Sequence, residues 1–404
     1  MPLKISNRLE SNYLNLQFKI LFEQLCSYLQ CKRSFNFMFT EKHHLNYLSP
    51  KDLDQYLKKG WFRMVQTVFT CQFLYFEGAI FSTIWIRRSL KSLEFTKNQR
   101  KLIKRNKERF KVEFGPLQIE RNKELLFHKY KKNFKGSTYM SLSSSLFEPF
   151  ELAKVLFNSY ECRVYDGDKL IALSVFDLGE KSMASIIGIY DPAYKAHSLG
   201  IFTMYLEMEF GHQLGYQWYY PGYVIPPNPR FNYKLKVGDV EYLDNKSQSW
   251  LPYKDLAPSN LPHQIMNKAL VLAYESLKNI NIDSKLMIYP PYEGTIFGLW
   301  SLDYLEYPII LEITASHAQS VVSLVLCFDS VSNNYKLFYC SNFHDLSTYY
   351  DGSTDPALAE GGVSHEISWE VKFKDQLLVE SADLKEIINI IVDQQFRTKD
   401  EPLI

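Results

Sequence analysis

The chain has 404 residues, of which 46% are hydrophobic and 15% aromatic, and its 46 basic side chains nearly balance 45 acidic ones. This length and apolar content exclude an intrinsically disordered chain and predict two or three domains of about 150 residues each. The charge is unevenly spread, because ten Lys and Arg accompany two acids between Arg87 and Arg109, whereas five accompany twelve acids between Asp351 and Ile404. The first segment suits contact with a polyanion, and the second would repel one.

The sequence contains no recognisable signal peptide, and no apolar run approaches the roughly 20 residues needed to span a bilayer. Six cysteines are scattered along the chain without a Cys-x-x-Cys pair. This spacing favours reduced thiols over disulfides. We therefore expect a cytoplasmic protein that does not contact a membrane.

Helices are expected to dominate the chain before residue 137, because apolar side chains recur there at helical spacing. Ser49 followed by Pro50 is a typical helix start, and Gly60 is a typical stop. Thr96 and Gln99 have the spacing of a capping box. The predicted helices cover residues 8 to 30, 50 to 59, 96 to 106 and 119 to 134, with an aromatic, β-prone stretch at residues 61 to 76.

The middle of the chain has the pattern of a β-hairpin, then a helix, then another strand. The hairpin consists of two apolar runs around a polar turn, and the helix has an apolar residue at every fourth position before Gly215. The last strand is interrupted at Pro221 and Gly222. Strands are expected at residues 162 to 165, 170 to 178, 183 to 190 and 216 to 225, and helices at residues 150 to 157 and 201 to 214.

This order of elements is the core of the N-acetyltransferase-like (GNAT-like) acyltransferase fold, in which two neighbouring strands separate and a helix points its N-terminus into the gap. Such an N-terminus suits a phosphate. Coenzyme A users of this fold carry Gln/Arg-x-x-Gly-x-Gly/Ala before the helix, whereas only Gly200 is present here. We therefore predict an α+β fold with a GNAT-like mixed sheet, a helical N-terminal region and an α+β C-terminal appendage, without a coenzyme.

The C-terminal region shows helices and strands but no motif that indicates an activity. Cys327, Cys340 and His344 lack a fourth ligand, so we interpret them as buried thiols and a surface histidine. The expected elements are helices at residues 264 to 277 and 382 to 396 and strands at residues 286 to 288, 309 to 314, 320 to 328 and 335 to 339. The expected domains cover residues 1 to 136, 137 to 244 and 256 to 404.

Several short blocks then occur in a fixed order: Leu170-Ile171-Ala172, Tyr190-Asp191-Pro192, Ser198-Leu199-Gly200, Leu206-Glu207, Glu209, Tyr219-Tyr220-Pro221-Gly222-Tyr223-Val224-Ile225 and Pro229-Arg230-Phe231-Asn232-Tyr233-Lys234. Together they resemble the arginyl-tRNA protein transferases and their bacterial leucyl-transferring relatives. The last two blocks are similar to that family's Tyr-x-Gly-aromatic-x-Ile and Pro-Lys-Met-x-Tyr-Lys. Upstream, Gly60-Trp61-Phe62-Arg63 is similar to its Gly-Trp-Arg-Arg. Each block alone is weak, but their order over about sixty-five residues is specific.

The resemblance implies an aminoacyltransferase. Its partners would be an aminoacyl-tRNA and an acceptor protein that begins with Asp or Glu, and not DNA. Arginine is the first choice for the transferred amino acid and leucine the second. Many family members also place cysteines before the basic helix, where thiolates hold zinc or an iron-sulfur cluster. Because this chain has only Cys71 there, we predict no metal.

The implied reaction needs positioning, a proton acceptor and a site for the developing oxyanion. The candidate catalytic residues are Tyr190, Asp191, Glu207 and Glu209. Glu207 and Glu209 are two residues apart on a helix, so at most one faces the cleft. The alternative roles are a turn residue for Asp191 and a solvated carboxylate for the second glutamate.

Binding residues follow from charge and from the blocks. For tRNA the candidates are Arg87, Arg88, Arg100, Lys101, Lys104, Arg105, Ser198 and Gly200, with a solvated basic face as the alternative. For the acceptor and the terminal adenine they are Tyr220, Tyr223, Arg230, Tyr233 and Lys234. The alternative is simple packing for the tyrosines and a surface cation at a strand end for the two basic residues. If Lys234 served the phosphate site instead, the acid pocket would be sought near Arg63. Two other functions stay open, an acetyl-coenzyme A dependent N-acetyltransferase and a binding protein that has lost turnover.

Overall fold

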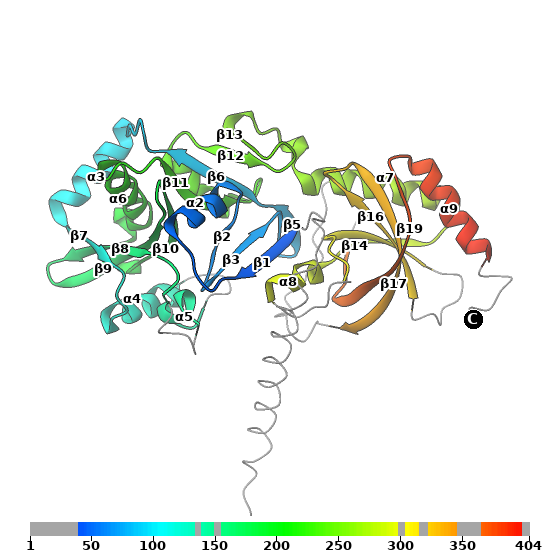
Figure 1. The fold of residues 1–404 in the computed structure, drawn as a ribbon, viewed down its shortest axis with the longest axis horizontal. Coiled ribbons are helices and arrows are strands. Elements are labelled where there is room, and N and C mark those ends of the chain that lie inside the picture. The colour runs from blue at the N-terminus through cyan, green and yellow to red at the C-terminus, as the bar shows by residue number, and fades with distance from the viewer. Residues whose placement is uncertain are drawn as a thin grey trace, which may run out of the picture.

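The computed structural model describes residues 39–133, 139–148, 155–297, 304–314, 322–345 and 365–397. These residues form two lobes (Figure 1), a first lobe of residues 39–261 and a second lobe of residues 262–397. The helix predicted at residues 8 to 30 lies outside the described residues, as does most of the helix predicted at residues 150 to 157. No described helix is both long and apolar enough to cross a bilayer.

The first lobe is built on a large mixed sheet. Its strands are β1 (Thr40–His44), β2 (Phe62–Met64), β3 (Thr67–Cys71), β4 (Phe73–Phe76), β5 (Ala79–Ser82), β6 (Ile84–Ser89), β7 (Lys111–Pro116), β8 (Ser159–Asp166), β9 (Lys169–Leu178), β10 (Ser182–Tyr190), β11 (Trp218–Val224), β12 (Glu241–Asp244) and β13 (Ser249–Pro252). Eight of them pair in the order β13-β12-β6-β11-β10-β9-β8-β7, and β1-β3-β2 and β4-β5 form two smaller sheets.

Helices cover both faces of the eight-stranded sheet. The helices are α2 (Pro50–Lys58), α3 (Lys97–Arg109), α4 (Arg121–Lys132), α5 (Leu142–Leu146) and α6 (Leu199–Gln213), with short 3-10 helices η2 (Pro192–His197), η3 (Pro229–Val237), η4 (Tyr253–Asp255) and η5 (Pro258–Asn260). Neighbouring residues of β9 point to opposite faces of the sheet. Phe176 packs in the core on the face that α6 covers, and Val175 packs in the core on the face that α4 covers. β9 is therefore buried on both faces, as its continuous apolar run predicts.

The predicted helix starts are confirmed at the two capping boxes. Ser49 caps α2 together with Asp52, and Thr96 caps α3 together with Gln99. The predicted hairpin is also confirmed, since β9 and β10 pair antiparallel.

The parallel strands β10 and β11 separate after a short contact. They pair only over Ser182 to Ala184 and Trp218 to Tyr220, although both strands continue well beyond. β11 also shifts register against β6 between Tyr219 and Gly222, at the predicted interruption. Beyond this contact the two strands are no longer paired, so a gap opens between them along one edge of β11. In the chain, α6 connects β10 to β11.

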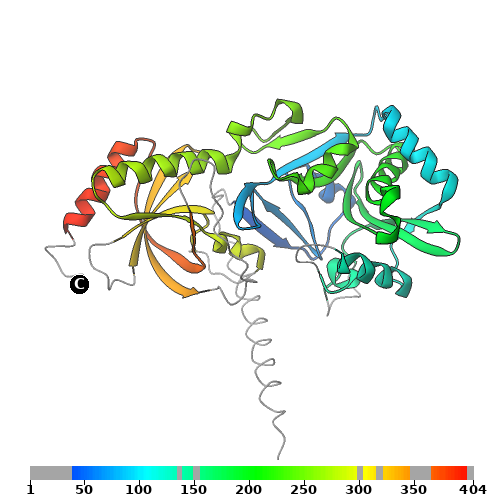
Figure 2. The ribbon, with the colours of Figure 1, turned by 180° about the vertical axis from the view of Figure 1, so that it is seen from behind.

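The second lobe is a curved six-stranded sheet with two helices packed against it (Figure 2). Its elements are α7 (Pro262–Asn279), β14 (Ser284–Ile288), η6 (Pro290–Glu293), α8 (Gly294–Phe297), β15 (Ile309–Ile313), β16 (Val322–Asp329), β17 (Asn334–Asp345), β18 (Glu366–Ile367), β19 (Glu370–Ser381) and α9 (Leu384–Arg397). The strand order is β18-β14-β15-β16-β17-β19. Apolar residues of α7 and α9, including Leu270 and Ile387, fill its core.

The region before residue 137 was expected to be helical, but its described residues contain seven strands, β1 to β7, and only three helices, because its aromatic and β-branched stretches pair into sheets. Other strands and one helix also differ from the sequence expectations. β7 and β19 are charged edge strands, and β13 lies in the segment expected to be a connector. α5 forms in the serine-rich segment because Ser141 caps it. The eight-stranded sheet also spans the boundary expected at residues 136 and 137, since β6 and β7 pair with β11 and β8.

Candidate active site

The gap between β10 and β11 is bordered by a buried acid, a half-buried lysine and several tyrosines. α6 lies on one side of the sheet at this gap and contacts β10 and β9. Its first turn contains Gly200, which lies against the ring of Tyr190 at the end of β10. η3 contacts both β11 and α6, so residues of η3 can reach the same place.

Glu207 is the buried acid, with no exposed surface. It projects from α6 toward the sheet, where Tyr219 of β11 donates its hydroxyl hydrogen to Oε2 at 2.8 Å. Burial raises the pKa of Glu207 to about 7, although the hydroxyls of Ser174, Tyr219 and Ser185 act in the opposite direction. This carboxyl group can therefore take up and release a proton near neutral pH.

Three further tyrosines border the gap, and Tyr233 is the one that Glu207 influences. Tyr233 of η3 is 47% exposed, and burial of its hydroxyl together with the charges of Tyr130 and Glu207 raises its pKa to about 12. The rings of Tyr130 on α4 and Tyr190 on β10 meet edge to face at 5.6 Å. The predicted residues Tyr190, Glu207 and Tyr233 thus gather at one place.

Lys234 lies in an aromatic cage beside β11. Its Nζ donates a hydrogen bond to the carbonyl oxygen of Tyr223 at 3.0 Å and lies 5.1 Å and 5.4 Å from the ring centres of Tyr223 and Phe231. Gly222, at φ +94°, makes room for it, since a Cβ there would be 3.0 Å from Nζ. Burial lowers the pKa of Lys234 to about 8. Within the described residues no carboxylate pairs with it.

Arg230, at the start of η3, already has an acidic partner, so its charge is less available to bind an acidic ligand. Its Nη1 is 3.3 Å from Glu77 Oε1, and its guanidinium lies 4.9 Å from the ring centre of Phe76. Of the two predicted cations, Lys234 is thus the one whose charge the described chain leaves uncompensated.

Asp191 and Glu209 have structural partners instead of facing the gap. Asp191 accepts from the backbone N–H of Ala193 and forms ion pairs with Lys169 and Lys129, and these partners hold its pKa below the usual value although burial acts against them. Glu209 pairs with Lys107 of α3. The geometry therefore favours the alternative role of a turn residue for Asp191, whereas Glu209 forms an ion pair between α6 and α3 instead of being the solvated carboxylate expected as its alternative.

Arg87, Arg88 and Tyr220 are held within the sheet. Arg88 is 9% exposed and donates to the carbonyl oxygens of Val237 and Glu94. Arg87 lies against the rings of Trp218 and Trp250 and pairs with Glu241. Tyr220 is 4% exposed and packs in the core with α2, away from Glu207. The positions of these three side chains argue against the tRNA or adenine contacts predicted for them.

The other predicted tRNA contacts are accessible. Arg100, Lys101, Lys104 and Arg105 are all exposed on α3, while Ile103 and Asn106 of the same helix face inward. Ser198 is exposed in front of α6, with φ 52°, and burial together with the charges of nearby Arg109 and Arg105 lowers the pKa of His197. A basic surface thus runs from α3 to the start of α6.

Arg63 and Cys71 are buried in the first lobe. Arg63 donates to Ser159 and Asp177 at 2.9 Å each and to the carbonyl oxygen of Leu146, so it offers no free pocket for an acid. Burial raises the pKa of the Cys71 thiol to about 12. No group of metal-ligating side chains occurs among the described residues.

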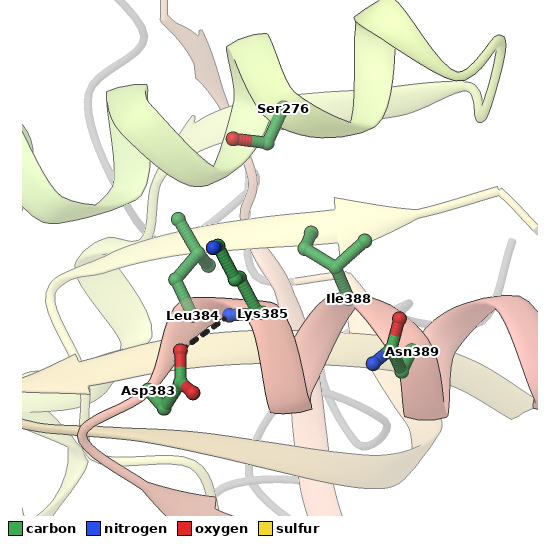
Figure 3. A pocket seen from close by; sticks show the side chains of 6 residues that line it. All are labelled: Ser276, Asp383, Leu384, Lys385, Ile388 and Asn389. Carbon is green, nitrogen blue, oxygen red and sulfur yellow. Dashed lines mark hydrogen bonds between the residues drawn. The ribbon is translucent and has the colours of Figure 1, made fainter.

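A groove of about 540 Å³ lies in the second lobe, away from this gap (Figure 3). It separates α7 from α9, and its walls are contributed by Ser276, Asp383, Leu384, Lys385, Ile388 and Asn389. Neither the buried acid nor the caged lysine contributes to it.

Sequence comparison confirms the family resemblance for part of the chain. Residues 122–244, which include the gap and η3, match the model of the C terminus of arginine-tRNA-protein transferases. An aspartate/glutamate leucyltransferase from Leptospira interrogans is 25% identical over 142 residues, which are 34% of this chain and 55% of that protein. Arginyl-tRNA–protein transferase 1 from Saccharomyces cerevisiae is 34% identical over 109 residues, 27% of this chain and 21% of the yeast protein.

The chain spans about half the length of the Leptospira relative. A leucyltransferase from Helicobacter hepaticus is covered over 90% of its length, at 24% identity. Among solved structures, the C-terminal domain of a putative lysylphosphatidylglycerol synthetase from Agrobacterium fabrum matches with a TM-score of 0.31 and 14% identity, over 42% of this chain and 58% of that one.

Two residues at the gap were not predicted from the sequence. Tyr219 was passed over for its neighbour Tyr220, because alternation along a strand leaves open which face the helix covers. Tyr130 was counted only as part of a basic helix, although its spacing from Leu126 and Phe127 places it on their buried face.

Proposed function

We propose that this chain transfers an amino acid from a charged tRNA to the N-terminal α-amine of an acceptor protein that begins with Asp or Glu, with arginine as the first choice and leucine as the second. The observation that carries the proposal is that one strand, β11, holds both the Glu207–Tyr219 pair and, through Tyr223, the caged Lys234. We also propose that this half of the first lobe is GNAT-like, because two parallel strands separate beside a connecting helix.

The reaction joins the amine nitrogen to the ester carbonyl carbon, breaks the ester bond to the tRNA ribose and moves one proton from the amine to the departing oxygen. The ester is already activated, so positioning supplies most of the rate. We assign the proton to the Tyr219–Glu207 pair, where Tyr219 passes its own hydrogen to Glu207 as it accepts another. A pKa of about 7 lets Glu207 return the proton in the same cycle.

Acceptor recognition is assigned to Lys234. An acidic N-terminal side chain that leaves water needs a cation, and Lys234 is charged below pH 8 without a carboxylate partner in the described chain. Tyr233 is the half-exposed neighbour that would border the entry.

The tRNA is assigned to the exposed face of α3, with Arg100, Lys101, Lys104 and Arg105, and to the start of α6 at Ser198 and Gly200. Phosphates bind to basic helices through charge and to a helix N-terminus through free N–H groups. We propose no coenzyme A, because Gly200 is the only glycine at the start of α6, and no metal, because Cys71 is a single buried thiol.

Incubation of the purified chain with a mixture of charged tRNAs and an Asp-initiated peptide tests the proposal. The expected result is a peptide whose mass has increased by one amino acid residue, and the increment identifies that residue. An acetyl increment with acetyl-coenzyme A would transfer the assignment to an acetyltransferase. No increment with any tRNA would leave a binding protein that has lost turnover.

A further inference from the structure

The β4-β5 hairpin connects the second lobe to the segment that holds Lys234. Its strands pair from Phe73 with Ser82 to Phe76 with Ala79, and its tip consists of Glu77 and Gly78. Both tip residues have positive φ, 51° and 80°. Two-residue turns of this kind usually carry Asn, Asp or Gly, so a glutamate at the first position is strained.

The base of the hairpin is packed in the second lobe (Figure 1). Phe73 is fully buried and belongs to the core formed by α7 and the six-stranded sheet, as does Ile80. The N–H of Tyr75 donates to Glu293 Oε1 of η6 at 3.2 Å. Ser82 Oγ is hydrogen bonded to His263 Nδ1 at 2.9 Å and accepts from the N–H of His263 at 3.0 Å, at the start of α7.

The tip of the hairpin contacts η3 in the first lobe. Glu77 pairs with Arg230, and the Phe76 ring lies 6.1 Å from Phe231. Phe231 in turn stacks on Tyr223 at 5.8 Å and forms part of the Lys234 cage. The hairpin therefore touches the second-lobe core at one end and the cage at the other.

The two tip contacts differ in strength. The Glu77–Arg230 pair is partly exposed, and such a pair contributes little by itself because water screens it. Phe76 adds an aromatic contact to Phe231 and a cation–π contact to Arg230. Packing and charge thus act on the same two residues of η3.

We propose that Phe76 and Glu77 are positioning residues that hold Arg230 and Phe231 and thereby fix the cage in which Lys234 receives the acceptor's acidic side chain. The second lobe then sets acceptor affinity through the hairpin that it anchors. This inference rests on the proposed function for its kinetic consequence only, because the positioning itself is a structural property.

The test compares Phe76→Ala/Glu77→Gly with the unchanged chain. Glycine relieves the strained turn while it removes the charge, so the hairpin itself keeps its fold. Deuterium exchange in residues 229–237 is expected to increase several-fold, while exchange in α6 stays the same. In the transfer assay the KM for an Asp-initiated peptide should rise about three- to tenfold, with kcat within twofold and tRNA binding unchanged.

A matched control is Asp168→Asn, which removes an exposed acid at the β8-β9 turn, far along the chain from η3. It should change neither readout. Unchanged exchange in residues 229–237 would overturn the proposal, and so would a lower KM, because that would make Glu77 a competitor of the acceptor. If the unchanged chain transfers no amino acid, the proposed function fails while the exchange measurement still decides the positioning role.

Discussion

Burial changes the proton affinity of two side chains at the gap between β10 and β11, and in opposite senses. It raises the pKa of Glu207 to about 7 and lowers that of Lys234 to about 8. Between these values Glu207 ionises while Lys234 keeps its charge. The two roles proposed for these side chains, a proton acceptor and a cation that binds a carboxylate, are thus compatible near neutral pH.

Glu207→Gln should abolish the proton acceptor while keeping the shape of the side chain. We expect kcat for aminoacyl transfer to fall about 100- to 10,000-fold, the usual contribution of a positioned acid–base group, with tRNA binding unchanged. Glu209→Gln is the matched control on the same helix, because Glu209 only pairs with Lys107. Equal losses in both variants would show that the effect arises from folding.

The pKa of Glu207 also predicts how stability depends on pH. Because its folded pKa lies above the unfolded value, the folded chain holds a proton that the unfolded chain has released between about pH 4.5 and 7. The free energy of unfolding should therefore decrease by about 1.4 kcal/mol for each pH unit across this window and stop decreasing above pH 7 from this cause. Denaturant unfolding should show a flatter pH profile for Glu207→Gln than for the unchanged chain.

Lys234→Ala should weaken acceptor binding. We expect the KM for an Asp-initiated peptide to rise by a factor that corresponds to about 1.5–3 kcal/mol, the range for hydrogen bonds to charged groups. In the unchanged chain the KM should also rise above pH 8, because Lys234 loses its proton there. Lys236→Ala, an exposed neighbour, is the control. Loss of tRNA affinity with unchanged peptide saturation would move Lys234 to the phosphate site.

At the scale of elements, the sequence predicts those that carry their own signals. The caps at Ser49 and Thr96, the turn between β9 and β10, and the interruption at Gly222 are local, and the structure confirms each. β7 and β19 were not predicted, because they are edge strands whose charged side chains interrupt the alternation of apolar and polar residues. The choice of Tyr219 over Tyr220 also needed the structure, since it depends on which face α6 covers.

The basic face of α3 predicts a salt-dependent interaction. Lys101→Glu/Arg105→Glu reverses two exposed charges and should lower tRNA affinity about tenfold near physiological salt, with a salt slope smaller by about two. Fluorescence anisotropy at several salt concentrations measures both quantities. Lys268→Glu/Lys278→Glu makes the same charge change on α7 and should have no such effect. Equal behaviour of the two variants would remove α3 from the tRNA site.

At the scale of the whole molecule, the contacts that join the lobes connect distant parts of the chain. Ser82 and His263 are 181 positions apart, and Glu77 and Arg230 are 153 apart. Periodicity and local motifs do not indicate contacts between such distant residues. From the sequence, we therefore expected the second lobe to be a separate appendage. The structure instead gives it a share of its core from β4 and β5.

Phe73→Leu tests this shared core. Phe73 lies in the first part of the chain yet is fully buried among residues of the second lobe. The smaller side chain should destabilise that lobe by about 1 kcal/mol, because it leaves part of the volume of the ring unfilled. Deuterium exchange in α7 should then rise about fivefold, whereas exchange in α6 should not change. Phe202→Leu, an equally buried substitution beside the eight-stranded sheet, should produce the reverse pattern. If Phe73→Leu instead raised exchange in α6 alone, the hairpin would belong to the first lobe energetically, and it could not transmit the position of the second lobe to Arg230.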